Sequence, residues 1–514
     1  MVRPSPGDLV ATLTLIAALG MTGCSSEALT STNAVLIVDK TFDLKTADPH
    51  RELSVTGAMI GKALYSTLLT FNGGDESTPV PLVAASYTSS EDARRFTFKL
   101  RRDVDFSAGN RLTSADVVFS LDRLAKLKGA PAALLTGVSW SAADAYTIVL
   151  TSNDPNPALP FVLTSPALAI VNSTTVRGKP DGFLDGTSAG SGPYILKSFS
   201  TFSDIALVAN PHYWRPKPFY RRIVIRNMDA RTQLAYISST MNEIALDLVP
   251  AQAETLGATR SVHISASPGP DIIFLFANTN AQVSQVTADR HFQNAVREAL
   301  DYKTMVALMG AGAVQAPGII PSSMRGTLPP WIAPRRDLER ARSELAASGI
   351  KDATVSLGYA NDLDVSGLPM SALASLVKAD LGDAGIKVDL AGTPSDTAKA
   401  DFEAGREQMG LWATQSSAGS TSYLDFLPGG VLGLRAGWQA GSDPSLESLG
   451  AQASTTADPA TQAQLLQQMQ EQLNQEGPFF PLLQPGRVIV SAGGGGAGLD
   501  YNPGWSLDLA AVTG

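Results

Sequence analysis

The sequence has very little cysteine and histidine. Cys24 is its only cysteine, so neither an intrachain disulfide nor a cysteine-based metal site can form. The four histidines, His50, His212, His263 and His291, lie far apart, and none belongs to a pair with the spacing of metal ligands. We therefore expect no metal centre, and no motif in the chain predicts a bound cofactor.

Positive charge and long hydrophobic runs are also scarce. The chain carries 39 Lys and Arg against 48 Asp and Glu, a formal net charge of −9. Such a chain has no attractive field for phosphate backbones, so nucleic-acid binding is not expected. After residue 20, no stretch approaches the ~18 uninterrupted apolar residues of a membrane-spanning helix. The 514 residues, 44% hydrophobic and 17% charged, are enough for about two to four globular domains.

The N-terminus has the features of a signal peptide. Arg3 precedes a short apolar run, Leu9–Gly20, which is too short to span a bilayer and has the length of a signal-peptide core. Met21-Thr22-Gly23-Cys24 follows at once and resembles a bacterial lipobox, in which the cysteine is acylated and becomes the mature N-terminus. We predict a signal peptide over residues 1–23, lipid on Cys24, a polar tether over residues 24–33, and an extracytoplasmic protein anchored to the cell membrane.

Strand and helix patterns alternate along the rest of the chain. Arg95–Arg101 alternates apolar and polar side chains, which predicts a half-buried strand. Thr113–Asp116 has the residues of a capping box, which predicts a helix start. Further along, Asp337 can cap a helix that Gly349 ends, a second apolar stripe ends near Gly385, and a strand pattern follows. This helix–glycine–strand order predicts an α/β fold.

One short motif matches a catalytic pattern. Gly186-Thr187-Ser188-Ala189-Gly190 reads as the G-x-S-x-G nucleophile elbow of α/β hydrolases, which needs an apolar strand before the serine and a helix after it. Here residues 178–185 are polar and interrupted by Gly and Pro, and Ser191-Gly192-Pro193 would break a helix. We interpret the motif as a structural loop and keep a serine hydrolase that uses Ser188 as the alternative function.

Several sequence blocks occur in an order and spacing typical of one protein family. The blocks are Pro81–Tyr87, Phe96–Arg101, Val104–Gly109, Leu112–Ser120, Ser191–Tyr194 with Asn210–Trp214, Asn278–Asn280, Val296–Asp301 and Pro317–Pro321. Together they resemble extracellular solute-binding protein family 5, the peptide- and nickel-binding components of ABC importers, which include dipeptide- and oligopeptide-binding proteins. The resemblance runs from about Ala34 to Val512 and so covers nearly the whole mature chain.

The resemblance implies an α/β fold of the periplasmic-binding-protein type, a two-lobed clamp with an extra subdomain inserted in lobe I. It places lobe I in residues 34–275 and 478–514, the inserted subdomain at about residues 70–187, and lobe II in residues 276–477. The two crossings, near Pro270–Asn280 and Gly477–Pro478, are the expected hinges, and their Pro and Gly residues are typical of such crossings. A clamp of this kind closes over a ligand that it buries between the lobes.

The implied function is capture for transport, not catalysis. The resemblance implies a monomeric, lipid-anchored protein that holds a small-molecule or peptide ligand in the inter-lobe cleft and delivers it to the permease subunits of an ABC importer. A short peptide is the first ligand expected, and haem, a metal chelate, an opine or a sugar are the alternatives. A receptor or chaperone role without an importer is a third hypothesis.

The resemblance also suggests which residues meet the ligand. In peptide binders of this family, an acidic residue shortly after a tryptophan often holds the α-amino group of the peptide. In the matching stretch Trp412 is present, but Gln415 and Ala418 occupy the acidic positions. A buried ammonium without a counter-charge costs on the order of several kcal/mol. We therefore expect Asp425 or an acid of lobe I to take the place of the missing carboxylate, or a ligand without a free amine. We predict Trp412 as an apolar wall, with Gln415 and Ser416 as hydrogen-bonding residues. The structural alternatives are core packing for Trp412 and a solvated loop or helix cap for Asp425.

Five further residues are candidate ligand contacts. Asp48 lies in a segment similar to the family's "LDP", and Tyr65 matches the aromatic residue of its "IYEGL" helix. Asn278 and Asn280 would lie at the hinge, and Arg435 is a candidate for a ligand carboxylate. The structural alternatives are a turn residue for Asp48, a cap for each asparagine and a solvated surface position for Arg435.

Overall fold

A mixed seven-stranded sheet organises one part of the computed structural model, which describes residues 35–493 and 496–514 apart from residues 178, 180–183, 185, 238–240, 258 and 260. Within it β1 runs parallel to both of its neighbours, β10 and β11. Leu36 and Val38 of β1 are fully buried against helix α1 (Val55–Leu64). In spatial order the strands are β12 (Val262–Pro268), β21 (Gly486–Ala492), β11 (Glu243–Ala245), β1 (Val35–Lys40), β10 (Arg222–Asn227), β9 (Asp204–Ala209) and β8 (Tyr194–Phe199).

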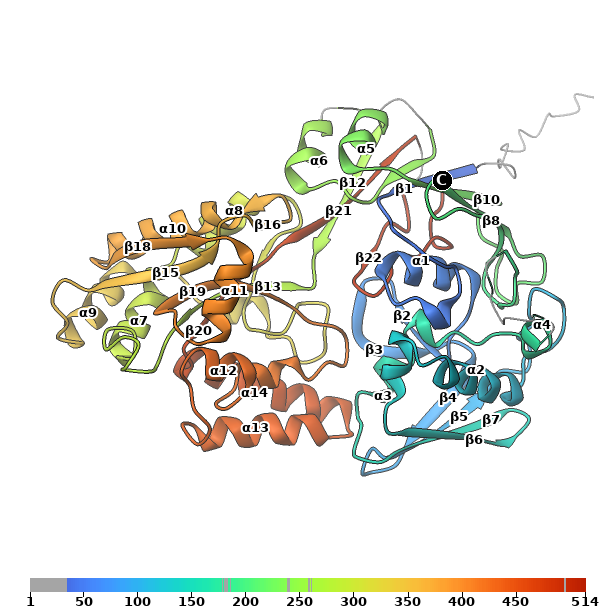
Figure 1. Ribbon diagram of the computed structural model, residues 1–514, viewed down its shortest axis with the longest axis horizontal. Helices are drawn as coiled ribbons and strands as arrows, with labels where there is room; N and C mark the ends of the chain where they lie inside the picture. Colours follow the sequence, from blue (N-terminus) through green and yellow to red (C-terminus); the bar gives the residue numbers. More distant parts are fainter. Residues whose placement is uncertain are drawn as a thin grey trace, which may run out of the picture. The chain divides into compact units, whose positions relative to one another are not determined.

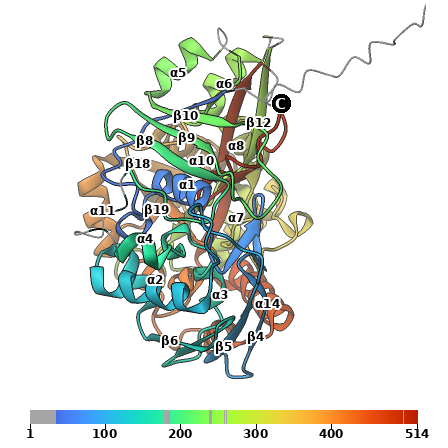
Figure 2. The ribbon, with the colours of Figure 1, turned by 90° about the vertical axis from the view of Figure 1, so that its right-hand side faces the viewer.

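A four-stranded antiparallel sheet with its own core follows β1 in the sequence (Figure 2). Phe96, Phe98 and Leu100 are buried on one face of β5, which confirms the predicted half-buried strand. Helix α2 (Ser114–Leu127) packs against them and begins after a capping box of Thr113 and Asp116, also as predicted. The strands, in spatial order, are β4 (Ala84–Ser89), β5 (Arg95–Leu100), β7 (Thr147–Ser152) and β6 (Val138–Asp144).

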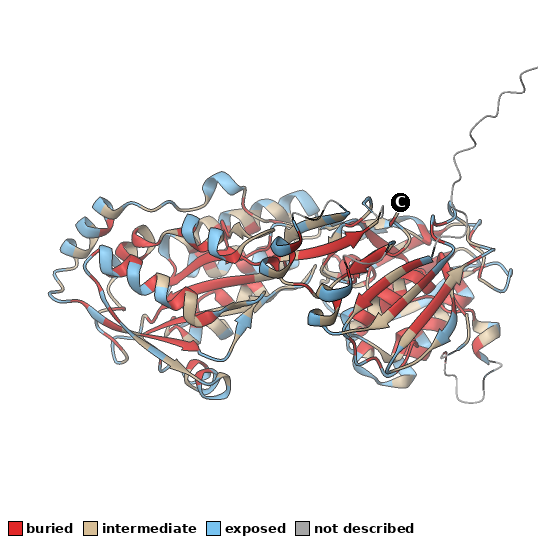
Figure 3. Cartoon of the chain, turned by 90° about the horizontal axis from the view of Figure 1, so that it is seen from above, coloured by how far each residue is buried: buried red, intermediate tan, exposed pale blue. Residues whose placement is uncertain are grey.

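A six-stranded sheet organises the other part of the fold. Its strand β13 is buried on both faces: Ile273 and Leu275 face helices α7, α9 and α10, while Phe274 and Phe276 face α13 and α14. Figure 3 shows these buried strands between helices whose outer faces are exposed. The strands, in spatial order, are β14 (Val314–Gln315), β20 (Phe479–Gln484), β13 (Asp271–Ala277), β19 (Met409–Gln415), β15 (Thr354–Ala360) and β18 (Lys387–Thr393).

Helix α9 begins and ends where the local sequence predicts. Asp337 caps α9, and Gly349 adopts a left-handed φ of +69° just after it. The helices not bounded above are α3 (Leu159–Val162), α4 (Ser173–Arg177), α5 (Ala230–Tyr236), α6 (Pro250–Leu256), α7 (Arg290–Ala299), α8 (Tyr302–Met309), α9 (Leu338–Ala347), α10 (Met370–Asp383), α11 (Ser395–Glu403), α12 (Val431–Arg435), α13 (Pro444–Thr455) and α14 (Pro459–Glu476). The short hairpin strands are β2 (Leu69–Asn72), β3 (Asp75–Pro81), β16 (Asp364–Val365), β17 (Leu368–Pro369), β22 (Tyr501–Asn502) and β23 (Ser506–Leu507).

The chain passes from the seven-stranded to the six-stranded sheet between β12 and β13, and returns between β20 and β21 (Figure 1). The two passages are hydrogen-bonded to each other. The Gly269 amide donates to the Pro485 carbonyl at 2.8 Å, and the Gln484 side chain donates to the Gly269 carbonyl at 3.0 Å. All three large sheets therefore belong to one unit, Asn33–Gly514.

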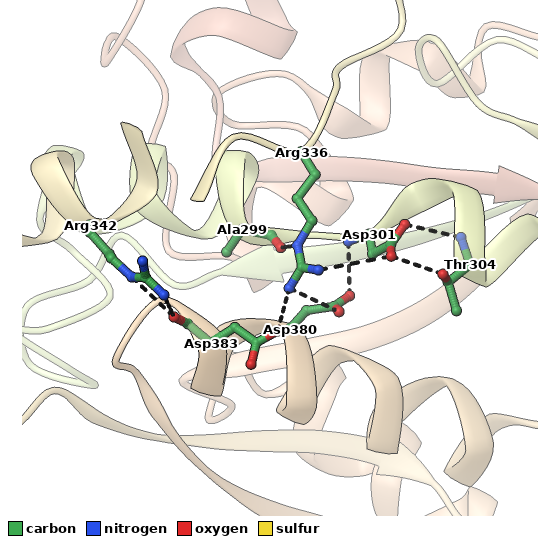
Figure 4. A network of polar contacts seen from close by, with 7 residues as sticks. All are labelled: Ala299, Asp301, Thr304, Arg336, Arg342, Asp380 and Asp383. Carbon is green, nitrogen blue, oxygen red and sulfur yellow. Dashed lines mark hydrogen bonds and ion pairs between the residues drawn. The ribbon is translucent and has the colours of Figure 1, made fainter. Parts of the chain in front are cut away.

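A polar network ties three helices of the six-stranded part together (Figure 4). The Arg336 guanidinium donates to the Ala299 carbonyl at 2.8 Å and to the Asp383 carboxylate at 2.7 Å. Asp380 accepts from the Asp301 amide at 2.9 Å and lies 3.6 Å from Arg336. One arginine thus joins the end of α7, the N-cap of α8 and the end of α10, which identifies this acidic cluster as part of the scaffold.

The helices of the described segments are too short or too polar to span a bilayer. The predicted signal peptide over residues 1–23, the acylated Cys24 and the tether over residues 24–33 lie outside the described residues.

Candidate functional site

A cavity of about 460 Å³, here called the central cavity, opens between the two large parts of the fold. One wall comes from α1, the β2–β3 hairpin, the α3 region and the loop after β22. The opposite wall is the segment 415–420, which begins at the last residue of β19 of the six-stranded sheet. The complete lining is Val55, Phe71, Glu76, Leu134, Phe161, Val162, Thr164, Ser165, Pro166, Pro270, Gln415, Ser416, Ser417, Ala418, Gly419, Ser420, Pro503, Gly504 and Trp505.

Three aromatic side chains form the apolar wall of the central cavity. The rings of Phe71 and Trp505 stack with centroids 6.1 Å apart and an interplanar angle of 26°. Phe161 lies 6.2 Å from Phe71, and Ala418 packs against the same cluster from the other side of the cavity. Aromatic faces carry negative partial charge, so this wall suits apolar groups and cations alike.

The opposite wall is polar and uncharged. β19 pairs with β13 as far as Gln415 opposite Asp271, and the chain then turns away into 416–421. The Ser416 amide donates to the Pro270 carbonyl at 3.4 Å, and its hydroxyl lies 3.2 Å from that of Ser422. This wall therefore presents hydroxyl, amide and backbone groups that can exchange hydrogen bonds with a ligand.

Glu76 is the one ionisable residue in the lining of the central cavity. It is 2% exposed, and its carboxylate accepts from the Gly504 amide at 3.2 Å. Burial raises the pKa of Glu76 to about 7, and the nearby charge of Asp75 acts in the same direction. The Glu76 amide donates to the Ser323 carbonyl at 2.9 Å, so this residue also links the β2–β3 hairpin to the six-stranded part.

A second cavity of about 300 Å³ shares Val55 and Gln415 with the central cavity. Its charged side chains are paired. Lys40 lies 2.8 Å from Asp247, and Arg487, on the strand that follows one passage between the sheets, lies 2.6 Å from Asp271 on the strand that follows the other. Charged side chains of both signs therefore line the second cavity, which adjoins the central cavity.

Gln415 and Ser416 lie where the sequence predicts, in the cavity wall. Trp412 lies elsewhere: it stacks on Phe402 with centroids 4.5 Å apart, and its indole N–H donates to Glu407 at 2.9 Å. The Arg435 guanidinium lies 4.8 Å from the other member of that stack, Phe402. Trp412 and Arg435 therefore pack around Phe402, and neither belongs to the lining of the central cavity.

The remaining acid predicted from the resemblance, Asp425, is half-buried in the turn before α12 and does not line these cavities. Burial raises its pKa, and the neighbouring Arg435 lowers it. The lining of the central cavity includes Glu76 of the first part of the fold and does not include Asp425.

Asp48 is a structural residue, in agreement with the turn interpretation. It has no exposed surface, and Arg123 donates to both of its carboxylate oxygens. The same guanidinium donates to His50, whose other ring nitrogen lies 2.8 Å from the Ala169 carbonyl. Arg123 occupies the Asp48 carboxylate, and Asp48 does not belong to the lining of the central cavity.

Asn278 and Asn280 cap a turn. Asn278 is fully buried; its side chain donates to the Glu407 carbonyl at 3.0 Å and accepts from the Asn280 amide at 2.9 Å. The Asn280 side chain accepts from the Gln282 amide at 2.9 Å. Tyr65 lines a neighbouring small cavity of about 50 Å³ with Lys62 and Arg215, and this cavity shares Thr164 and Pro166 with the central cavity.

Sequence reasoning missed Glu76, Phe161 and Trp505. Glu76 lies in the polar hairpin Asp75–Pro81, where an acid is unremarkable. Phe161 follows Pro160 in a four-residue helix, which has no clear periodicity. Trp505 follows the glycine-rich segment 493–498, and a large aromatic residue in such a polar loop was the one available signal.

The serine-hydrolase hypothesis finds no support in the structure. Ser188 is followed by coil and then by β8, not by the helix that a nucleophile elbow needs. Its hydroxyl accepts from the Leu196 amide at 3.1 Å, which anchors the loop to β8. Among the described residues, no three His, Cys, Asp or Glu side chains gather in a manner suited to a metal ion.

Comparison with known proteins gives matches along most of the chain. Residues 78–427 match the model of the bacterial extracellular solute-binding proteins, family 5 Middle. A probable D,D-dipeptide-binding periplasmic protein of Escherichia coli (strain K12) is 26% identical over 355 residues, which cover 67% of this chain and 68% of that protein. The glutathione-binding protein GsiB of the same strain is 26% identical over 490 residues, 89% of this chain and 90% of that protein. The structure of HbpA2 from Haemophilus parasuis superimposes with a TM-score of 0.80 at 21% identity, covering 93% of this chain and 99% of that chain.

Proposed function

Because the chain belongs to the bacterial extracellular solute-binding proteins, family 5, we propose that it captures a short peptide between its two lobes and delivers it to the permease of an ABC importer. Its fold is the two-lobed α/β fold of periplasmic binding proteins. It is a solute-binding protein of the peptide- or nickel-type ABC importers. The two Escherichia coli relatives described above are named for the peptides that they bind, a D,D-dipeptide and glutathione. The peptide ligand is our proposal for this chain.

The central cavity is the observation that carries this proposal. Its volume of about 460 Å³ falls within the ~300–1,000 Å³ of typical small-molecule sites. Residues of both parts line it, so closure of one part on the other would bury the ligand. Gln415 and Ser416 support hydrogen bonds to peptide groups, and the aromatic wall supports apolar side chains.

We propose that the hinges are the two passages between the large sheets. The strands change sheet at residues 268–271 and 484–486, so lobe I would comprise residues 35–268 and 486–514, and lobe II residues 271–484. These boundaries shift the sequence-based ones because β13 and β20 both pair within the six-stranded sheet. The four-stranded sheet supports the inserted subdomain at about residues 70–187 of lobe I.

We also propose that residues 1–23 are removed as a signal peptide and that lipid on Cys24 holds the protein at the outer face of the cell membrane. Metabolic labelling with an alkyne fatty acid tests this step: the wild-type chain should take up the label and Cys24→Ala should not. Equal labelling of the two proteins would contradict the lipid anchor.

Mass spectrometry of ligands that co-purify with the protein from its own host tests the central proposal. We expect short peptides, released unchanged in mass, bound one per monomer in native spectra. X-ray scattering should show a smaller radius of gyration when the identified peptide is added. Isothermal titration without heat for every peptide tried, together with no compaction, would contradict peptide capture, and a covalently altered ligand would contradict a purely binding role.

A further inference from the structure

The central cavity contains one buried carboxylate and no basic side chain in its lining. Glu76 is 2% exposed and forms no ion pair among the described residues; its side chain accepts a hydrogen bond from the neutral Gly504 amide at 3.2 Å. An ionised carboxylate taken out of water is unfavourable unless a positive charge or several donors compensate it. The site therefore lacks a positive charge that compensates the Glu76 carboxylate, and a cationic ligand can supply this charge.

The basic side chains near the aromatic wall are engaged elsewhere. Lys62 lies 4.4 Å from the Trp505 ring centre, but it donates to Thr70 at 3.0 Å and pairs with Asp508 at 3.4 Å. Arg325 lies 4.5 Å from the Phe161 ring centre, donates to the Ser77 carbonyl at 3.1 Å and faces the neighbouring small cavity. Neither side chain lines the central cavity, so neither neutralises Glu76 there.

The rest of the wall favours the same kind of guest. The rings of Phe71, Phe161 and Trp505 share the cavity with Glu76, and an organic cation gains from both a carboxylate and aromatic faces. The opposite wall, Gln415–Ser420, carries no charge that would repel a cation. From this geometry we propose that Glu76 binds the ammonium group of the ligand, which for a peptide is its free N-terminus. This inference rests on the proposed function and assigns the end of the peptide that Glu76 binds.

Binding should then depend on the ionisation of Glu76. Burial raises the pKa of its carboxyl to about 7. The other titratable groups near it are Asp75 on the same strand, which raises that pKa further, and Tyr501 on β22, whose own pKa Glu76 raises. An ammonium would stabilise the ionised form, so affinity for amines should increase between about pH 6 and pH 8 and proton release should accompany binding at pH 7.

The test uses the mature full-length protein with two probe sets. The first is a pool of free-amine peptides of two to five residues together with the same pool N-acetylated. The second is a panel of simple amines: butylammonium, phenethylammonium and agmatine. Binding is measured by native mass spectrometry and isothermal titration for the wild type, Glu76→Gln and the matched control Asp75→Asn, which neutralises an exposed acid outside the cavity lining.

We expect the wild type to retain free-amine peptides and to bind their acetylated forms about thirtyfold or more weakly. Glu76→Gln should lose a similar factor for free-amine peptides and change little for acetylated ones, while Asp75→Asn should stay within about threefold of the wild type. If Glu76→Gln does not fold, the comparison of free-amine with N-acetylated peptides on the wild type becomes the deciding measurement.

The outcomes separate the two proposals. Equal binding of free and acetylated peptides, or unchanged binding by Glu76→Gln, would overturn the role of Glu76 and leave peptide capture intact. Glu76-dependent binding of simple amines without any peptide would overturn peptide capture and support the cation site. Binding of neither probe set by the wild type would overturn both.

Discussion

Arg325 of the six-stranded part places its guanidinium carbon 4.5 Å from the ring centre of Phe161, which belongs to the part with the four-stranded sheet. The same guanidinium donates to the Ser77 carbonyl at 3.1 Å and is held from its own side by Gln462 at 3.0 Å. Arg325 is therefore a direct contact between the two proposed lobes, at the edge of the cavity that they share.

The Arg325 contact should contribute to lobe closure. Arg325→Ala removes a cation–π contact and a hydrogen bond across the cleft, so we expect the Kd of the identified ligand to rise about three- to tenfold. X-ray scattering should give a larger radius of gyration for the variant. The control is Arg340→Ala, since Arg340 is exposed and pairs with Glu298 within the six-stranded part. Unchanged affinity and size for Arg325→Ala would contradict this role.

Asp48 should matter for stability and not for ligand affinity. Asp48→Asn leaves Arg123 buried without its counter-charge, which should lower the free energy of unfolding by about 3–5 kcal/mol. Urea denaturation measures this loss, and titration of the folded variant should give the wild-type Kd. Asp43→Asn, at an exposed ion pair with Lys45, should change stability by less than about 0.5 kcal/mol. A loss of ligand affinity without a loss of stability in Asp48→Asn would show instead that Asp48 contacts the ligand.

Trp505, not Trp412, should report ligand binding. Trp505 lines the central cavity, whereas Trp412 packs on Phe402 and donates to Glu407. The ligand-induced change in tryptophan fluorescence should therefore persist in Trp412→Phe and largely disappear in Trp505→Phe. Trp412→Phe should instead lower the free energy of unfolding by about 1–3 kcal/mol, because the buried Glu407 loses its donor. The reverse fluorescence pattern would place Trp412 at the ligand.

Glu407 should make the protein less stable as the pH rises. Burial raises the pKa of Glu407 to about 7 from 4.5, the Asp401 charge adds to this, and the Trp412 indole N–H opposes it. The folded state therefore holds a proton that the unfolded state releases above pH 4.5, so the contribution of Glu407 to stability is complete below that pH and is lost as the pH rises through 7. Glu407→Gln should match the wild type near pH 4.5 and exceed it by about 1–3 kcal/mol at pH 8 in urea denaturation. Equal pH profiles for the two proteins would contradict the raised pKa.

Local patterns explain why the secondary structure could be predicted. The alternation of Phe96, Phe98 and Leu100 and the caps at Thr113 and Asp337 involve neighbours within a few residues, so the sequence contains the whole signal. The false nucleophile elbow at Ser188 was recognisable for the same reason, because the residues that follow it cannot begin a helix. The family resemblance added the two-lobed arrangement, which no local pattern contains.

The sequence by itself determined the fold class, the family and two residues of the cavity lining, Gln415 and Ser416, which lie at the end of one contiguous motif. Only the tertiary structure decided that Arg123 pairs with Asp48, that Trp412 stacks on Phe402, and that Glu76, Phe161 and Trp505, far apart in the sequence, line one cavity. A cavity of this kind is formed by segments that sheet pairing brings together, and neither burial nor the partner of a charge is encoded at the position of one residue.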